Sequence, residues 1–108
     1  MTSEHSQPLF FIGQLVHHIK FDYRGVIIDV DAEFEGTEDW YQQVALSRPP
    51  KDKPWYHVLV DNSNQLTYVA ERNLEEDSTN EPISHPAIDM YFDGFDNGIY
   101  NLSAKSSN

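Results

Sequence analysis

Short apolar runs separated by turn-forming segments follow one another along this chain, and they predict strands rather than long helices. Residues 26–31 (VIIDVD) are rich in β-branched side chains, which favour strands. Because successive strand residues point to opposite faces, the alternation assigns this strand an apolar face and a partly wet face. The first face holds Val26, Ile28 and Val30, and the second holds Ile27, Asp29 and Asp31.

Two further segments predict a β-hairpin in the middle of the chain. Residues 55–61 (WYHVLVD) give the strongest strand pattern, and residues 66–71 (LTYVAE) give a second one. The turn-forming residues between them connect the two strands. An additional strand is expected over residues 13–20, followed by a turn in which Gly25 could form a bulge.

Two short helices are expected outside these strands. Thr37 is a typical N-cap for a helix within residues 36–47, with Trp40, Val44 and Tyr41 on one face. Residues 48–54 contain three prolines and form an exposed loop. A second helix could begin near Pro86, and its apolar face would contain Ile88, Tyr91, Phe92 and Phe95.

These elements predict a mostly β fold, in the form of a small barrel with one or two short helices. The length of 108 residues fits one domain. We expect a disordered N-terminus over residues 1–8, a single domain over 9–102 and a frayed tail over 103–108.

Composition narrows the classes of function. The chain has no cysteine, which excludes disulfides and thiolate chemistry. It shows neither a signal peptide nor an apolar run long enough to span a bilayer, so we expect a soluble cytoplasmic protein with no membrane partner. The net charge of −11 repels polyanions. Only Arg48, Lys51 and Lys53 cluster among the bases.

The residues that could carry chemistry form no catalytic motif. The sequence has no GxSxG, GxGxxG or GxxxxGK[ST] pattern, so we expect no enzymatic activity and no cofactor. His17 and His18 point to opposite faces of a strand, and His57 is expected to be a hydrogen-bonded structural histidine. Asp29 and Asp31 project to the same face, where they could act as paired carboxylates or hold a cation. The simpler interpretation is a solvated strand face with no metal.

Aromatic residues offer candidates for partner binding. Trp55 and Tyr56 point to opposite faces of their strand, so at most one faces the core, and the other is exposed, covered by a loop or available to a partner. Tyr23 lies beside Arg24, and such residue types are enriched at binding hot spots. The predicted partner-binding residues are Tyr23, Arg24, Trp55 and Tyr56, although simple packing of the barrel also accounts for each of them.

Several segments together resemble the HspQ/YccV family. They are Phe11-Ile12-Gly13-Gln14 with Val16 and His18, Tyr23-Arg24-Gly25-Val26, Asp29-Val30-Asp31, Pro54 to Val60 (PWYHVLV), Tyr68-Val69-Ala70-Glu71 and Asn73-Leu74. His85-Pro86 and Phe92 resemble the alphaproteobacterial subgroup. The resemblance covers roughly residues 9–100, and the combination of PWYHVLV with YVAE is its most specific part.

The resemblance implies a fold and two alternative functions. Family members are SH3-like β-barrels with short helical additions. They are associated with heat shock and with the protease Lon, whose choice of substrates they enhance, and they are also described as binding hemimethylated DNA. Oligomers are expected in at least some members. The resemblance supplies no catalytic residue.

The predicted partners are therefore Lon or its protein substrates, with hemimethylated DNA as the alternative. DNA binding would require Arg24 and the clustered bases Arg48, Lys51 and Lys53. Modulation of Lon requires no basic surface. A third hypothesis is a small-molecule or metal site formed by Asp29, Asp31 or the histidines.

Overall fold

The structure, a computed structural model, describes residues 7–103, which contain a curved five-stranded antiparallel sheet and a separate two-stranded one. The first four strands form a meander, and the fifth returns to pair with the first, so the order is β4-β3-β2-β1-β5. This arrangement confirms the predicted mostly β, SH3-like fold. The strands are β1 (Leu15–His18), β2 (Arg24–Asp31), β3 (Trp55–Val60), β4 (Leu66–Ala70) and β5 (Leu74–Glu76), with a 3-10 turn η1 (Glu71–Asn73) between the last two.

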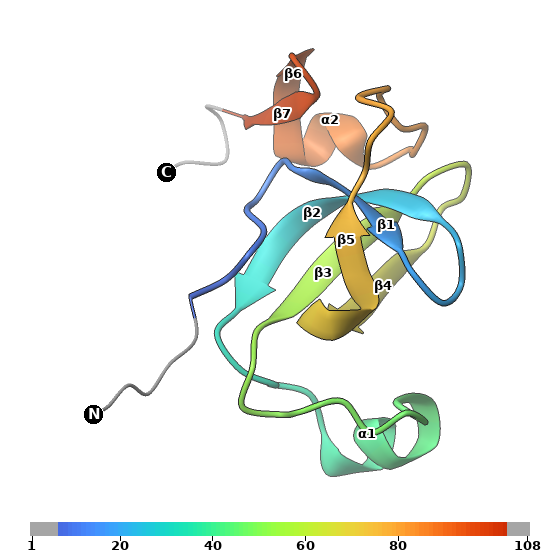
Figure 1. Cartoon of the computed structure of the whole chain (residues 1–108). Coiled ribbons are helices and arrows are strands. Elements are labelled where there is room, and N and C mark those ends of the chain that lie inside the picture. The colour runs from blue at the N-terminus through green and yellow to red at the C-terminus, as the bar shows by residue number, and fades with distance from the viewer. Residues whose placement is uncertain (1–6, 104–108) are drawn as a thin grey trace.

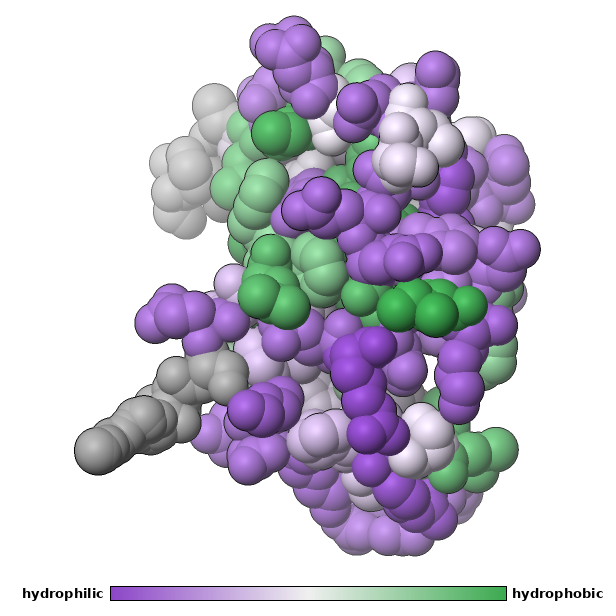
Figure 2. Space-filling view, in the orientation of Figure 1, coloured by the Kyte–Doolittle hydropathy of each residue, from purple (hydrophilic) through white to green (hydrophobic). Residues whose placement is uncertain are grey.

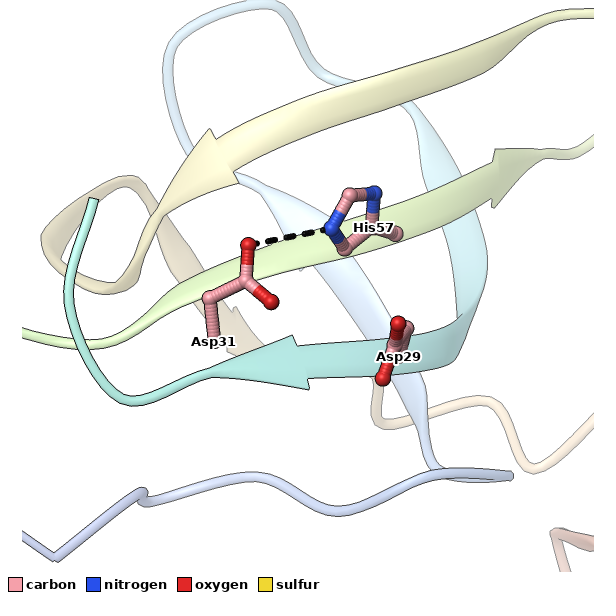
Figure 3. Close-up of side chains that lie close together, drawn as sticks. All are labelled: Asp29, Asp31 and His57. Carbon is pink, nitrogen blue, oxygen red and sulfur yellow. Dashed lines mark hydrogen bonds and ion pairs between the residues drawn. The ribbon is translucent and has the colours of Figure 1, made fainter. Parts of the chain in front are cut away.

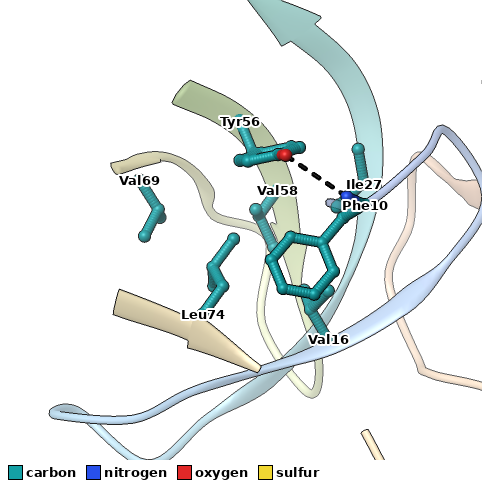
Figure 4. Close-up of a cluster of buried hydrophobic side chains, with 7 residues drawn as sticks. All are labelled: Phe10, Val16, Ile27, Tyr56, Val58, Val69 and Leu74. Carbon is teal, nitrogen blue, oxygen red and sulfur yellow. Dashed lines mark hydrogen bonds between the residues drawn. The ribbon is translucent and has the colours of Figure 1, made fainter. Parts of the chain in front are cut away.

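The concave face of the sheet encloses the main core (Figure 4). Tyr56 lies at its centre and is 0% exposed. Its hydroxyl donates to Glu71 Oε2 at 2.6 Å and accepts from the backbone N–H groups of Leu9 and Phe10. One side chain on β3 thereby ties the N-terminal segment to η1. The cluster consists of Phe10, Val16, Ile27, Tyr56, Val58, Val69 and Leu74.

Two separate caps cover the ends of the convex face (Figure 1). At one end, α1 (Glu38–Val44) packs with Trp55 and Ala70 through Tyr41. As predicted, Thr37 caps this helix by accepting from Trp40 N at 3.1 Å. Val44 was expected on the packed face but is 55% exposed.

The cap at the other end differs from the prediction. The helix α2 (Ile88–Tyr91) is only one turn long, and β6 (Phe92–Asp96) pairs with β7 (Ile99–Leu102). The expected helical face reaching Phe95 is therefore wrong. The turn residues Asn97 and Gly98 have φ angles of 54° and 77°, and an Asn-Gly pair with positive φ is the usual two-residue hairpin turn.

A β-bulge in β2 corrects the predicted facing of that strand. Ile27 lies opposite Val58, but Asp29 lies opposite His57, so one extra residue is inserted between Ile27 and Asp29. Beyond the bulge the alternation is inverted. Val30 consequently packs against the main core with Ile27, rather than sharing a face with Val26 as expected.

The structure describes only a small part of the predicted N-terminal and C-terminal segments. Residues 1–6 and 104–108 lie outside the described residues, and with them most of the expected disordered start and frayed tail. Ser103, the first residue of the expected tail, is buried and its N–H donates to Tyr91 O at 2.9 Å. No described helix has the length and apolar character needed to cross a membrane.

Gly25 lies in β2, not at the bulge, and its role can be tested by substitution. A Cβ atom at this position would lie 2.5 Å from Leu59 O and from Val58 Cγ1. We predict that Gly25→Ala lowers the free energy of unfolding by about 1–3 kcal/mol, because the packed backbone must shift. Urea unfolding monitored by tryptophan fluorescence would measure this change.

Gly94→Ala is the matched control. A Cβ atom there would meet only Asn101 Nδ2, at 3.7 Å, which is an ordinary contact. Its free energy of unfolding should stay within about 0.5 kcal/mol of the wild-type value. Equal losses in the two variants would contradict the close approach of β2 and β3 at Gly25.

Candidate functional site

A groove of about 660 Å³ runs beside β4. One wall comes from the β1–β2 turn, including Lys20 and Phe21, and the other from the end of α1, including Val44 and Leu46. Every residue of β4 contributes to its lining. The groove therefore follows a strand that, among the described strands, pairs with β3 only.

The outer edge of β4 offers main-chain hydrogen-bonding groups. Val60 N donates to Gln65 O, and Glu71 N donates to Pro54 O, both at 3.1 Å. These bonds mark the bonded positions of the β3–β4 ladder, and such positions alternate along an antiparallel pair. The N–H and C=O groups of Leu66, Tyr68 and Ala70 consequently point away from β3.

The groove is apolar and contains no acid. Phe21, Leu46 and Leu66 are 73%, 76% and 54% exposed. Figure 2 shows hydrophobic surface over the β1–β2 turn and again beside α1, with hydrophilic surface over much of the rest of this face. None of the described residues that line the groove is Asp or Glu, although the chain has 18 of them. An exposed apolar patch in so acidic a chain is typical of an interaction surface.

The β1–β2 turn is held in place by His18. Its Nδ1 accepts from the backbone N–H groups of Lys20 and Phe21, at 3.2 and 3.0 Å. The ring of Phe21 stacks on the imidazole with 4.6 Å between centroids. Burial, together with the nearby charges of His17 and Lys20, lowers the pKa of His18. The neutral imidazole thus shapes one wall of the groove.

Of the four predicted partner-binding residues, Tyr23 and Trp55 line the groove, whereas Arg24 and Tyr56 do not. Tyr23 lines the groove, and its hydroxyl is 2.8 Å from Thr67 Oγ1. Trp55 and Tyr56 are both buried, at 1% and 0% exposure, because α1 covers one face of β3 and the main core covers the other. Trp55 lines the groove although it is almost fully buried, and Tyr56 offers no surface to a partner. Arg24 lies outside the groove, near β5.

The four predicted DNA-contacting bases have partners within the chain. Arg24 donates to Asp61 and Asp77, at 3.1–3.2 Å. Arg48 donates to the last carbonyls of α1, among them Ala45 O at 3.0 Å. Lys51 pairs with Glu38 and lies 4.3 Å from the ring centroid of Tyr41. Lys53 also has an interaction partner.

Two histidine clusters remain as polar sites. The ring nitrogens of His17 each lie 2.7 Å from a carboxylate, one from Asp22 and the other from Glu75. Hydrogen bonds to these two carboxylates raise the pKa of His17. His57, as predicted, is hydrogen-bonded, to Asp31 at 3.2 Å. With Asp29 and Asp31 it forms a group whose ligand atoms lie within 4.8 Å of one another.

Sequence patterns missed the apolar residues that define the groove. Phe21 lies in a segment expected to be only a turn, and Leu46 follows a helix just before a proline-rich loop. The sequence feature that could have identified them is an apolar residue in a segment without a core-facing pattern. Such residues have no packing role in the predicted barrel and are therefore candidates for a binding surface.

The curved sheet and the groove beside its edge strand define a small SH3-like β-barrel domain. The family model described as "Hemimethylated DNA-binding protein YccV like" matches residues 8–99. The chain therefore belongs to the YccV-like family. This is a family of binding domains, in agreement with the resemblance that the sequence indicated.

The pKa values of the adjacent histidines should lie on opposite sides of the ordinary value of 6.5, with that of His17 raised and that of His18 lowered. A raised pKa means that the contribution of His17 to stability is present below pH 6.5 and is lost as the pH rises through the folded-state pKa. A lowered pKa means that the contribution of His18 is present above pH 6.5 and is lost as the pH falls below it. Imidazole NMR titrations would measure both midpoints.

His17→Gln provides the control for this titration. It should remove the higher midpoint and leave the resonances of Phe21 in their wild-type positions near neutral pH. Acidification should shift the Phe21 resonances in both proteins as His18 takes up a proton. Equal midpoints for the two histidines would be inconsistent with the hydrogen bonds described above.

Proposed function

We propose that this protein is a non-enzymatic binding module that modulates Lon-dependent protein degradation by contacting protein segments in the groove beside β4. The observation that supports this function best is the combination of an apolar, acid-free groove with an edge strand whose outward main-chain groups have no strand partner within residues 7–103. Family membership is consistent with a binding role.

The proposed mode of binding is addition of a strand. An extended segment would pair with the outward groups of Leu66, Tyr68 and Ala70. Its alternate side chains would contact Phe21 on one wall and Leu46 on the other. Because the chain carries a net charge of −11, apolar segments flanked by basic or neutral residues should bind better than acidic ones.

Substitutions on the groove walls would test this function. Phe21 and Leu46 are exposed, so Phe21→Asp and Leu46→Asp should leave the free energy of unfolding close to wild type. We predict that each reduces the stimulation of Lon by several-fold, because a carboxylate in the apolar groove must be desolvated. The measurement is the rate at which purified Lon degrades a panel of substrates at physiological salt.

Met90→Asp is the matched control, since Met90 is 70% exposed and lies on α2, outside the residues that line the groove. It should stimulate Lon like the wild-type protein. A protein that stimulates no substrate at all would refute the Lon function. Stimulation that survives both groove variants would instead refute the groove as the contact surface. Loss of a concentration-dependent dimer in the groove variants would identify a second copy of the chain as the occupant.

The second candidate function is binding of hemimethylated DNA, which the family description supports. Any phosphate contact by Arg24, Arg48 or Lys51 would compete with the partner that each already has within the chain. We therefore predict weak binding with a shallow salt dependence, since each phosphate contact adds about one unit to the slope of log K against log[salt].

Titration of hemimethylated and unmethylated duplexes at two salt concentrations would test this candidate. The double variant Arg48→Glu/Lys51→Glu should change the affinity little if DNA binding is not the function. Tight, methylation-dependent binding that this variant abolishes would favour the DNA function over the protein-binding one.

A further inference from the structure

Asp29, Asp31 and His57 form a polar cluster on the convex face of the sheet (Figure 3). Asp29 and Asp31 project from β2, and His57 projects from the neighbouring strand β3. The two caps pack against the ends of this face, with Trp55 under one and Leu59 under the other. His57 lies between these residues in sequence and shares their side of β3, so the cluster lies between the caps.

The bulge in β2 creates this cluster. Without the extra residue, the pairing of Ile27 with Val58 would continue and place Ile28 opposite His57. The shifted register places Asp29 there instead. Directly opposite residues in an antiparallel pair have Cβ atoms about 4.5–5.5 Å apart on the same face. One imidazole nitrogen and two carboxylates consequently converge from two adjacent strands.

Tyr68 on β4 orients one of the carboxylates. Its hydroxyl donates to Asp31 Oδ2 at 2.6 Å, and its ring packs against His57 with 4.6 Å between centroids. Metal-ligating carboxylates are commonly held by such an outer hydrogen bond.

The cluster has ligand capacity beyond its internal contacts. The bond between His57 Nε2 and Asp31 Oδ2, at 3.2 Å, is longer than the 2.7–2.9 Å that is usual for a charge-assisted hydrogen bond. The hydrogen bond of Asp29 within the described residues is to the backbone N–H of Val30, through Oδ1. Its other oxygen is thus available, and the two like-charged carboxylates would be stabilised by a cation.

We propose that Asp29, Asp31 and His57 bind a divalent transition-metal cation of the Zn²⁺ type. An imidazole nitrogen suits zinc and its neighbours, and two carboxylate oxygens complete three protein ligands. The fourth position faces solvent beside the exposed Asp29. Hard cations such as Mg²⁺ bind less well here, because they prefer oxygen ligands alone. This inference is independent of the proposed function.

Isothermal titration of the untagged full chain with ZnCl₂ tests the site. The expected result is one saturable site that is weakened at least about tenfold in Asp29→Asn and in His57→Gln, since even an outer hydrogen-bonding partner of a metal ligand contributes about 10–100-fold. Asp29→Asn is the safer variant for folding, because its amide oxygen can still accept from Val30 N. Millimolar Mg²⁺ should not displace the Zn²⁺.

His17→Gln is the matched control. Both ring nitrogens of His17 already contact carboxylates on opposite sides of the ring, so this cluster cannot direct one imidazole nitrogen and two carboxylates at a single ion. Zn²⁺ binding should be unchanged in that variant. The proposal is overturned by the absence of saturable binding at millimolar Zn²⁺, by wild-type affinity in both Asp29→Asn and His57→Gln, or by loss of the site in His17→Gln.

Discussion

The bulge between Ile27 and Asp29 is the constraint on which both faces of the sheet depend. A strand with unbroken alternation would place Ile27, Asp29 and Asp31 on one side, so that either carboxylates would enter the core or an isoleucine would face water. The extra residue removes this conflict, because Ile27 and Val30 both pack inward while Asp29 and Asp31 both point outward. Burial of two branched side chains and hydration of two carboxylates thus become compatible within one eight-residue strand.

Local patterns predicted the elements whose stability is largely local. The β-branched strands, the β3–β4 hairpin and the Thr37 cap could all be identified from the sequence, because each depends on residues close together in the chain. The bulge could not, since an inverted alternation in VIIDVD is consistent with the same letters and only pairing with β3 selects it. The strand β5 was hidden by its acidic residues, which are exposed on an edge strand paired with β1. The Asn97-Gly98 turn was present in the sequence, but the apolar spacing of residues 88–95 favoured a helix.

The candidate site depends on tertiary structure to a greater extent. The groove walls come from the β1–β2 turn and from the end of α1. Phe21 and Leu46, on the two walls, are 25 positions apart in the sequence and approach each other only because both walls pack beside β4. Trp55 and Tyr56 are the most prominent aromatic residues in the sequence, yet both are buried. Phe21, which lies in a predicted turn, and Leu46, which lies just beyond the observed end of α1, are the exposed ones. In a small barrel the largest aromatic side chains are needed for the core, so its binding surface must come from apolar residues that the core does not use.

Charge distribution distinguishes the two proposed functions physically. A chain with net charge −11 can bind DNA only where bases are gathered and available, and three of the four candidate bases already neutralise acids or cap helix carbonyls. If these bases contacted phosphates instead, Asp61, Asp77 and Glu38 would lose those partners. Part of the binding free energy gained from the phosphates would therefore be offset by the ion pairs lost within the protein. Binding an extended apolar segment beside β4 disturbs none of these pairs. The same excess of acid favours a cation at the cluster of Asp29, Asp31 and His57, so the electrostatics that oppose DNA binding support the other two interactions.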